Sequence, residues 1–319
     1  MADVITTALT YSREDVNKYF LQPMFLGDQD ISRFDVMLNV KSSFKLQKFA
    51  SLEKITKAYA SGFTGSTGST LTQREIVMSR VKAEVEQEAN TFYNTIVGDW
   101  LAAGNDIDNL DGTMLQEIIA EIMGKGLKRD NSRQLWFNDT ASGSADYDIY
   151  NGIFKNYTSL PAGQQIVGPV GALAADAATA QMQAAIDASP DELRELKGQA
   201  VLEISGSYAD NYRATLRSTG TEIADGVLRD GEDMLSYDGY PIIVHREWDT
   251  HISADSLATD PHRIVLHVPK NVAIGTDLGG EATANFWYNP DLILNRFRAT
   301  YAIGTQYKND ELAVTNISA

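Results

Sequence analysis

The sequence predicts an α+β protein with two domains, the second of which is inserted into the first. Alternating apolar and polar residues between positions 36 and 88 predict a long β-hairpin. Helical and short strand patterns alternate from 172 to 270, which predicts a compact α/β domain with a mixed sheet. A second alternating run near Arg296 predicts a long strand that returns to the first domain.

The first 35 residues have short amphipathic pieces that are broken by Pro23 and Gly27, and we expect an N-terminal arm that packs on neighbouring chains. A frayed terminus is the simpler alternative. The beginning of the chain has no basic segment followed by an apolar run, so a secretory signal is not expected. Uninterrupted apolar stretches stay well short of the ~18 residues that a membrane-spanning helix needs, so we expect no membrane partner.

The predicted hairpin is basic, although the chain as a whole carries a net charge of −16. Residues 36–82 contain eight basic and two acidic residues, a net charge of +6, so the rest of the chain carries −22. The tip, residues 62–70, consists almost entirely of glycine, serine and threonine, which favours turns and flexible coil. Because two isolated strands are marginally stable in water, we expect the hairpin to lie on an acidic surface. That surface belongs either to another copy of the chain or to its own subunit. The candidate contact residues are Lys41, Lys45, Lys48, Lys54, Lys57, Phe63, Arg74, Arg80 and Lys82.

Two helices are expected after the hairpin. Residues 89–102 have apolar side chains at helical spacing, weakened by Gly98. The pattern from Thr113 to Gln116 is typical of a capping box, and an apolar stripe follows it up to a stop at Gly124 and Gly126. Residues 133–139 then predict a short strand or turn.

A connection rich in glycine and proline, residues 161–170, marks the boundary of the second domain. An alanine-rich helix is expected over 172–188, and a second capping box at Ser189 begins a helix that runs to about Lys197. The remaining expected elements are strands at 200–204, 239–244 and 264–268, a helix at 208–218, a strand around 296–303 and a last short strand at 312–314.

Composition narrows the function classes. The chain has 319 residues and is 43% hydrophobic, so it can build a substantial core. It has no cysteine, which excludes disulfides, thiolate metal sites and cysteine nucleophiles. A sequence pI near 4.6 disfavours a general nucleic-acid-binding role, because phosphate repels an acidic surface. Phosphate-binding, nucleophile-elbow and zinc-protease motifs are absent from the sequence.

One group of residues has side chains that can bind metal or transfer protons. Its members are His245, Glu247, Asp249, His251, Asp260 and His262. The first four alternate, so on a strand they would share one face, and a metal site or an acid–base pair is one hypothesis. Solvated loop residues are the more frequent explanation of such spacing. We therefore assign no catalytic, cofactor-binding or metal-binding residue and expect a protein that is not an enzyme.

The order of these parts resembles a tailed-bacteriophage major capsid protein with the Hong Kong 97-type fold. Local similarity is found in three runs. They are Ser189–Arg194 with Leu202–Ser205 and Tyr208–Tyr212, then Asp238–Ile242, and then Arg296–Ala299 with Gly304–Lys308. The resemblance implies an N-terminal arm (1–35), an extended β-hairpin loop (36–88), a peripheral domain with a spine helix (89–159 and 273–319) and an inserted axial domain (160–272).

The resemblance also implies a function. The chain would be a structural protein that self-assembles as hexamers and pentamers into an icosahedral head, enclosing double-stranded DNA without binding a sequence. It would be located in the virion after assembly in the host cytoplasm, with scaffold, portal and decoration proteins as further partners. One alternative is an encapsulin-type nanocompartment shell, which would need an apolar cargo pocket near an N-terminal helix. The other is a metal-dependent hydrolase that uses His245, Asp249 and His251.

Overall fold

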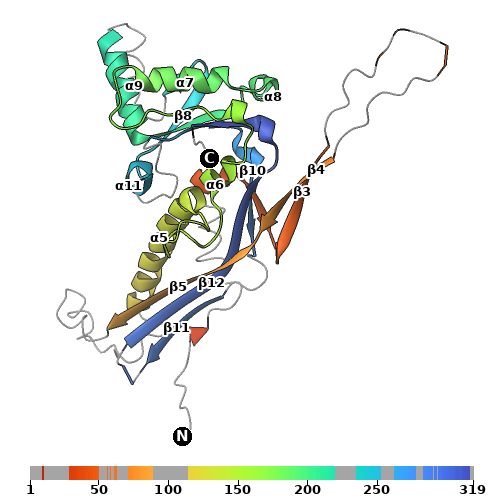
Figure 1. The fold of residues 1–319 in the computed structure, drawn as a ribbon. Coiled ribbons are helices and arrows are strands. Elements are labelled where there is room, and N and C mark those ends of the chain that lie inside the picture. Colours follow the sequence, from red (N-terminus) through yellow and green to blue (C-terminus); the bar gives the residue numbers. More distant parts are fainter. Residues whose placement is uncertain are drawn as a thin grey trace.

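The computed structural model has two lobes and a projecting hairpin (Figure 1). It describes residues 9–10, 29–49, 56, 58, 61–62, 71–88, 114–219, 235–252, 262–277, 283–289, 291–292 and 294–316. Among these residues, no helix has both the length and the apolar character to span a membrane. The predicted helix at 89–102 lies outside the described residues.

The first lobe is built on a six-stranded sheet around the long strand β12 (Leu294–Tyr307). β12 pairs with β11 (Thr283–Asn289), β10 (Val272–Thr276) and β5 (Ser79–Glu88), all antiparallel. β1 (Leu9–Thr10) extends the sheet beside β11, and β2 (Asp35–Leu38) lies parallel to β10. The predicted C-terminal strand is confirmed: Phe297, Ala299 and Tyr301 are buried, whereas Arg298 between them is exposed.

Helix α5 (Met114–Phe137) covers one face of this sheet (Figure 1). The predicted stop at Gly124 and Gly126 is wrong, and so is the predicted strand or turn at 133–139, because the helix continues past both glycines and ends at Phe137. Either glycine would have open space around an added Cβ, so neither is required by a turn. Each costs the helix about 1 kcal/mol relative to alanine. Burial of Leu135, Trp136 and Phe137 outweighs that cost.

The second lobe contains a five-stranded sheet in the order β13-β9-β6-β8-β7. Its strands are β6 (Val201–Ser205), β7 (Ser236–Tyr237), β8 (Tyr240–His245), β9 (Ile264–His267) and β13 (Ala313–Thr315). The β6–β8 pair is parallel and the others are antiparallel, so the predicted mixed sheet is confirmed. The expectation that the last short strand returns to the first domain is wrong for β13, because Val314 is fully buried in the core of the second lobe.

Helices α7 (Ala177–Asp187) and α9 (Gly206–Thr219) pack on the second sheet. α7 begins five residues later than predicted. The capping box at Ser189 is not formed, since its hydroxyl donates backward to the Ala185 carbonyl (2.8 Å) and Pro190 precedes the first residue of α8. The short helices are α3 (Gln29–Ser32), α6 (Ile153–Tyr157), α8 (Asp191–Glu195) and α11 (Trp248–Ile252), and the 3-10 turns are η3 (Ala162–Gln164), η5 (Pro269–Asn271) and η6 (Asp310–Leu312).

Each lobe has its own hydrophobic core. In the first, Trp136 lies 4.6 Å from the Trp248 ring centre and 5.2 Å from that of Phe154. The Trp136–Trp248 pair is edge-to-face, a geometry that adds to the free energy gained from buried area. This aromatic core therefore stabilises the lobe to which the hairpin is attached.

Candidate assembly surface: the hairpin and its root

The hairpin consists of β3 (Ser43–Phe49) and β4 (Leu71–Val77), paired in antiparallel register (Figure 1). Its limbs are shorter than the predicted 36–88 hairpin, because β2 and β5 on either side belong to the six-stranded sheet. Between β2 and β3 the chain turns at Asn39, whose φ is +63°. Val40 donates its amide to the Thr276 carbonyl (3.2 Å), so the turn is tied to the sheet before the hairpin begins.

The apolar part of the hairpin root packs on two glycines of the sheet. Gly275 of β10 faces Gly304 of β12 in register. A Cβ on Gly304 would lie 3.0 Å from the carbonyl carbon of Val77 and closer still to its oxygen, and a Cβ on Gly275 would lie 2.9 Å from Met78 Sδ. Strand β4 therefore crosses the sheet at a distance that only glycine permits. Ile76, which is fully buried, fills the crossing point.

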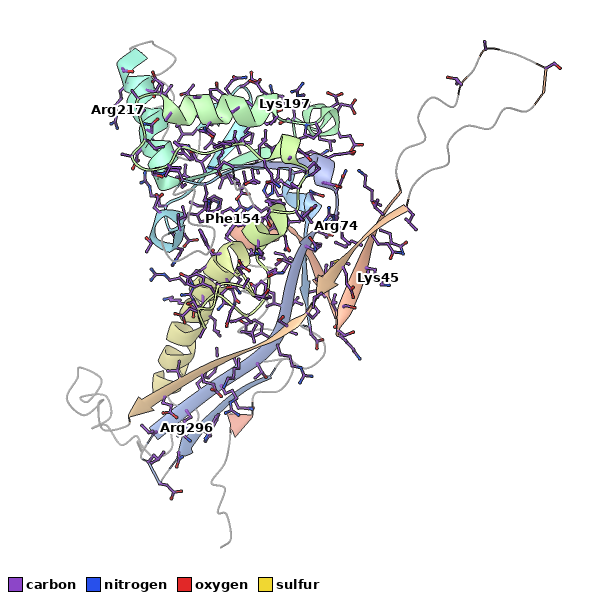
Figure 2. All side chains as sticks on the ribbon, viewed as in Figure 1. Lys45, Arg74, Phe154, Lys197, Arg217 and Arg296 are labelled. Carbon is purple, nitrogen blue, oxygen red and sulfur yellow. The ribbon has the colours of Figure 1, made fainter. Side chains whose placement is uncertain are left out.

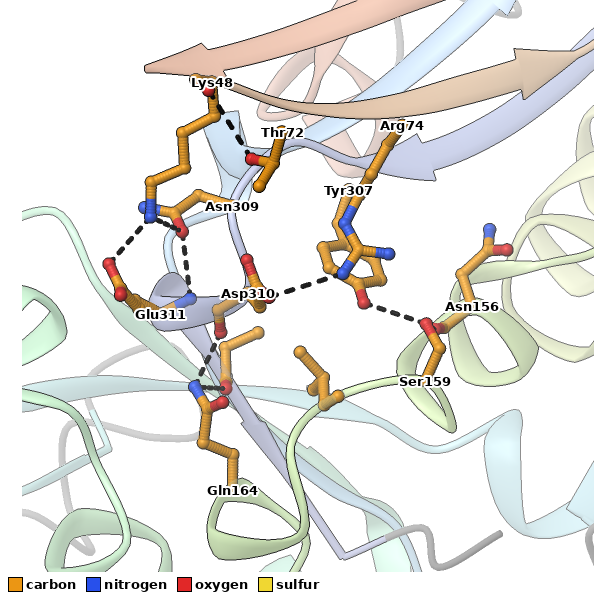
Figure 3. Close-up of polar contacts among 12 residues, drawn as sticks. Lys48, Thr72, Arg74, Asn156, Ser159, Gln164, Tyr307, Asn309, Asp310 and Glu311 are labelled. Carbon is orange, nitrogen blue, oxygen red and sulfur yellow. Dashed lines mark hydrogen bonds and ion pairs between the residues drawn. The ribbon is translucent and has the colours of Figure 1, made fainter. Parts of the chain in front are cut away.

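The polar part of the root ties the hairpin to η6 (Figure 3). Lys48 Nζ donates to Glu311 Oε2 and to Asn309 Oδ1, both at 2.7 Å. Arg74 lies 3.5 Å from Asp310 Oδ2, and its guanidinium stacks 4.0 Å from the Tyr307 ring centre. These contacts bridge more than 230 positions in the sequence, so they fix the direction of the hairpin relative to the body.

The network continues to the second lobe through a carboxyl pair. Asn309 Nδ2 donates to Glu192 Oε2 (3.0 Å) of α8. The hydrogen bond from Lys48 lowers the pKa of Glu311, whereas the hydrogen bond with Glu311 raises the pKa of Glu192. Glu311 is therefore the carboxyl group that stays ionised beside Lys48, and Glu192 is the one that binds a proton more readily.

The nine residues predicted to contact another subunit lie in different parts of the structure. Lys48 and Arg74 turn toward the chain's own body. Lys41 and Lys45 are exposed, and Figure 2 shows Lys45 on the side of the hairpin that faces away from the lobes. Lys54, Lys57 and Phe63 lie outside the described residues.

Arg80 and Lys82 are on β5 and not on the hairpin. They line a hollow of about 420 Å³ over the β5–β12 pair, and Lys82 donates to Glu84 (2.9 Å). Whether any of the nine residues contacts another subunit stays a prediction.

The hairpin also exposes apolar side chains, with Leu71 and Val77 on its outer face and Phe44 on the face that carries Ile76. Val77 is 64% exposed, Leu71 46% and Phe44 42%. Exposed apolar groups beside cationic ones are common in surfaces that bind other proteins. These three residues are not among the contacts predicted from the sequence.

The expected row of metal-capable residues is not formed. The predicted strand placement is wrong, because β8 ends at His245 and α11 begins at Trp248. Asp249 accepts from the backbone amide and the hydroxyl of Ser207 (2.8 Å each), which stabilises the beginning of α9. His251 Nδ1 lies 3.3 Å from the Tyr147 hydroxyl, and burial, followed by Arg133, lowers its pKa.

His262 contacts Ser207 and the Gly171 carbonyl, and Asp260 lies outside the described residues. In the part of the chain that the structure describes, no three metal-capable side chains converge as a metal site would require.

Sequence reasoning missed the partners at the root, which are Glu192, Gly275, Gly304, Tyr307, Asn309, Asp310 and Glu311. The polar run after β12 could have been recognised as a turn. No local pattern indicates that this turn binds Lys48 and Arg74.

No family model matches the sequence, and no curated protein matches it significantly. Solved structures match over nearly the whole chain. A chain of the satellite phage P4 procapsid with its size determination (Sid) protein has a TM-score of 0.64 at 12% identity, covering 98% of this chain and 92% of that one. A chain of the bacteriophage PhiM1 mature capsid has a TM-score of 0.55 at 10% identity, covering 99% and 90%. A chain of the native GTA particle capsid has a TM-score of 0.54 at 12% identity, covering 100% and 95%.

These likenesses extend over both lobes and the hairpin, and they confirm the predicted resemblance at the level of the fold. The chain therefore has the α+β fold found in phage and GTA capsids.

Proposed function

We propose that this chain is the major structural subunit of a phage head, which assembles as hexamers and pentamers into an icosahedral shell around double-stranded DNA. One observation carries the proposal beyond the shared fold: a hairpin anchored on its own body projects from the first lobe (Figure 1), and its side chains Lys45, Leu71 and Val77 are exposed. A two-stranded hairpin is marginally stable by itself in water.

The charges favour another copy of the same chain as the partner. Lys48 and Arg74 are neutralised at the root by Glu311 and Asp310. The exposed Lys41 and Lys45 are left to face the exterior, and the chain outside residues 36–82 carries −22. A basic hairpin is attracted to the acidic body of a neighbour, and the exposed Val77 and Leu71 add apolar area to that contact.

The domain division proposed from the sequence accompanies this function. Residues 1–35 are the arm, and the extended loop lies within 36–88, between β2 and β5. Residues 89–159 and 273–319 without β13 form the peripheral domain, and 160–272 together with β13 form the axial domain. Scaffold, portal and decoration proteins are its expected further partners in the virion, and assembly takes place in the host cytoplasm. The role is structural and requires no catalysis by this chain.

The test is electron microscopy and light scattering of the expressed full chain, compared with Lys45→Glu. Arg217→Glu is the matched control, since it reverses an exposed charge on the second lobe, remote from the hairpin (Figure 2). We expect closed shells from the wild type and the control, and a loss of shells with K45E. A chain that stays monomeric at high concentration would refute the proposal. Shells purified with packaged protein in place of nucleic acid would favour a nanocompartment.

A further inference from the structure

A fully buried carboxylate, Glu203, lies on the central strand β6 of the second sheet. Its neighbours along the strand, Leu202 and Ile204, face the core of the second lobe. Side chains alternate along a strand, so Glu203 points to the opposite side, toward the first lobe. A buried charge is tolerated only where ionic and hydrogen-bonding partners surround it.

Two histidines of adjacent strands bind this carboxylate. His245 Nε2 of β8 lies 2.8 Å from Glu203 Oε2, and His267 Nε2 of β9 lies 2.9 Å from Oε1. A carboxylate only accepts, so each imidazole donates through Nε2. His267 Nδ1 then accepts from the Tyr157 hydroxyl of α6 (2.6 Å). Both oxygens of Glu203 thereby accept a hydrogen bond from an imidazole, and a buried carboxylate also needs a cation close to it.

Arg33 supplies that cation. Its Nη2 lies 3.1 Å from Glu203 Oε2 and 3.2 Å from His245 Nε2. The guanidinium lies against both the carboxylate and one imidazole, and these three side chains are not arranged as a metal site among the described residues. Arg33 is the counter-ion of Glu203, although 170 positions separate them.

Arg33 belongs to the segment 29–38, which contains α3 and β2 and is called the strap below. Ile31 and Phe34 of the strap are buried, and β2 pairs with β10. Lys270 Nζ donates to the carbonyls of Ser32 (3.1 Å) and Phe34 (2.7 Å). The strap thus closes over the seam between the two lobes and carries Arg33 into it.

The ionisation of Glu203 depends on this arrangement. Burial by itself would raise the pKa of its carboxyl group, but Arg33 and then the hydrogen bonds from His245 and His267 hold the pKa well below its usual value. Without Arg33, burial acts with less opposition, so the carboxyl group binds a proton more readily.

We propose that the strap is an acid-released latch, in which the departure of Arg33 from Glu203 is coupled to the uptake of one proton by the carboxylate. The charged and titratable groups that face Glu203 are Arg33 of the strap, His245 of β8, His267 of β9 and Tyr157 of α6. The closed latch has an ionised carboxylate and the open latch a protonated one. The open form therefore binds more protons, and lowering the pH favours it by up to about tenfold per pH unit for one proton.

Hydrogen–deuterium exchange of the full chain tests the latch, with rates corrected for the intrinsic pH dependence of exchange. In the wild type, protection of amides 29–38 should fall as the pH is lowered from about 7.5 to 5. In Glu203→Gln, which keeps both histidines, this pH dependence should disappear. Glu195→Gln, an exposed substitution on the same lobe, is the matched control and should behave as the wild type.

A second variant keeps the test decisive if E203Q does not fold. Arg33→Gln combined with E203Q removes both buried charges, and its strap should likewise exchange at a rate independent of pH. In Arg33→Gln alone, the strap should be more protected at pH 5 than at pH 7.5. Without Arg33, the charge of the Glu203 carboxylate is uncompensated, and protonation at the lower pH removes that charge. The proposal would be overturned if the exchange rate of the wild-type strap did not depend on pH. It would also be overturned if the pH dependence persisted in variants without Glu203, because the imidazoles would then be its source.

Discussion

The glycine pair under the hairpin allows a graded test of how the root is built. In Gly304→Ala, the new methyl group would overlap the Val77 carbonyl, which is backbone and can move only with strand β4. In Gly275→Ala, the nearest atom is Met78 Sδ at 2.9 Å, the end of a flexible side chain. Overpacking of a well-packed site costs typically 1–3 kcal/mol. We expect G304A to lose about 3 kcal/mol of unfolding free energy and G275A less than about 1 kcal/mol.

Urea unfolding measures these losses, and hydrogen exchange of residues 43–49 and 71–77 locates them. Gly126→Ala is the control, because its Cβ would meet open space in helix α5. That change should stabilise the chain by about 0.5–1 kcal/mol. Two results would contradict this reasoning: G304A as stable as the wild type, or G275A losing as much unfolding free energy as G304A. In either case the close crossing of β4 over the sheet would not be what anchors the hairpin.

Three further predictions concern the cores. Phe154→Ala should cost about 3–5 kcal/mol in urea unfolding, since this fully buried ring packs on both Trp136 and Trp248. Tyr157→Phe should cost about 1–3 kcal/mol, because His267 Nδ1 loses its buried donor, and the loss should be small in a variant that also carries His267→Leu. Burial raises the pKa of Tyr157 well above its usual value. This contribution to stability is present below about pH 10 and is lost as the pH rises through the native-state value, so alkaline unfolding should release phenolate absorbance in one cooperative step.

Local patterns were sufficient to predict the strands and several helices. β12 was predicted because apolar and polar residues alternate over its length. β6, β8 and β9 were predicted from short apolar runs bounded by turn signals. Helix α5 was cut short because Gly124 and Gly126 locally favour a stop. Burial of Leu135 and Trp136, which the sequence does not display, decides against that stop.

The candidate site was predictable only in its location. The basic composition between Val36 and Lys82 identified the hairpin, but it did not distinguish Lys48 and Arg74, which face inward, from Lys45, which is exposed. That distinction depends on Asp310 and Glu311, more than 230 positions away. Pairings at such separations are created by the topology of the sheets and leave no periodic signal in the chain.

The root changes the interpretation of the hairpin itself. From charge alone, every lysine of this segment is equally suited to a neighbouring acidic surface. Ion pairs within the chain satisfy Lys48 and Arg74, and the Gly275–Gly304 crossing fixes the strands between them. The hairpin is thus held in direction before any partner arrives, and a preorganised element loses less conformational entropy on binding. A contact between copies then depends on the exposed outer limbs, because the inner residues are already engaged at the root.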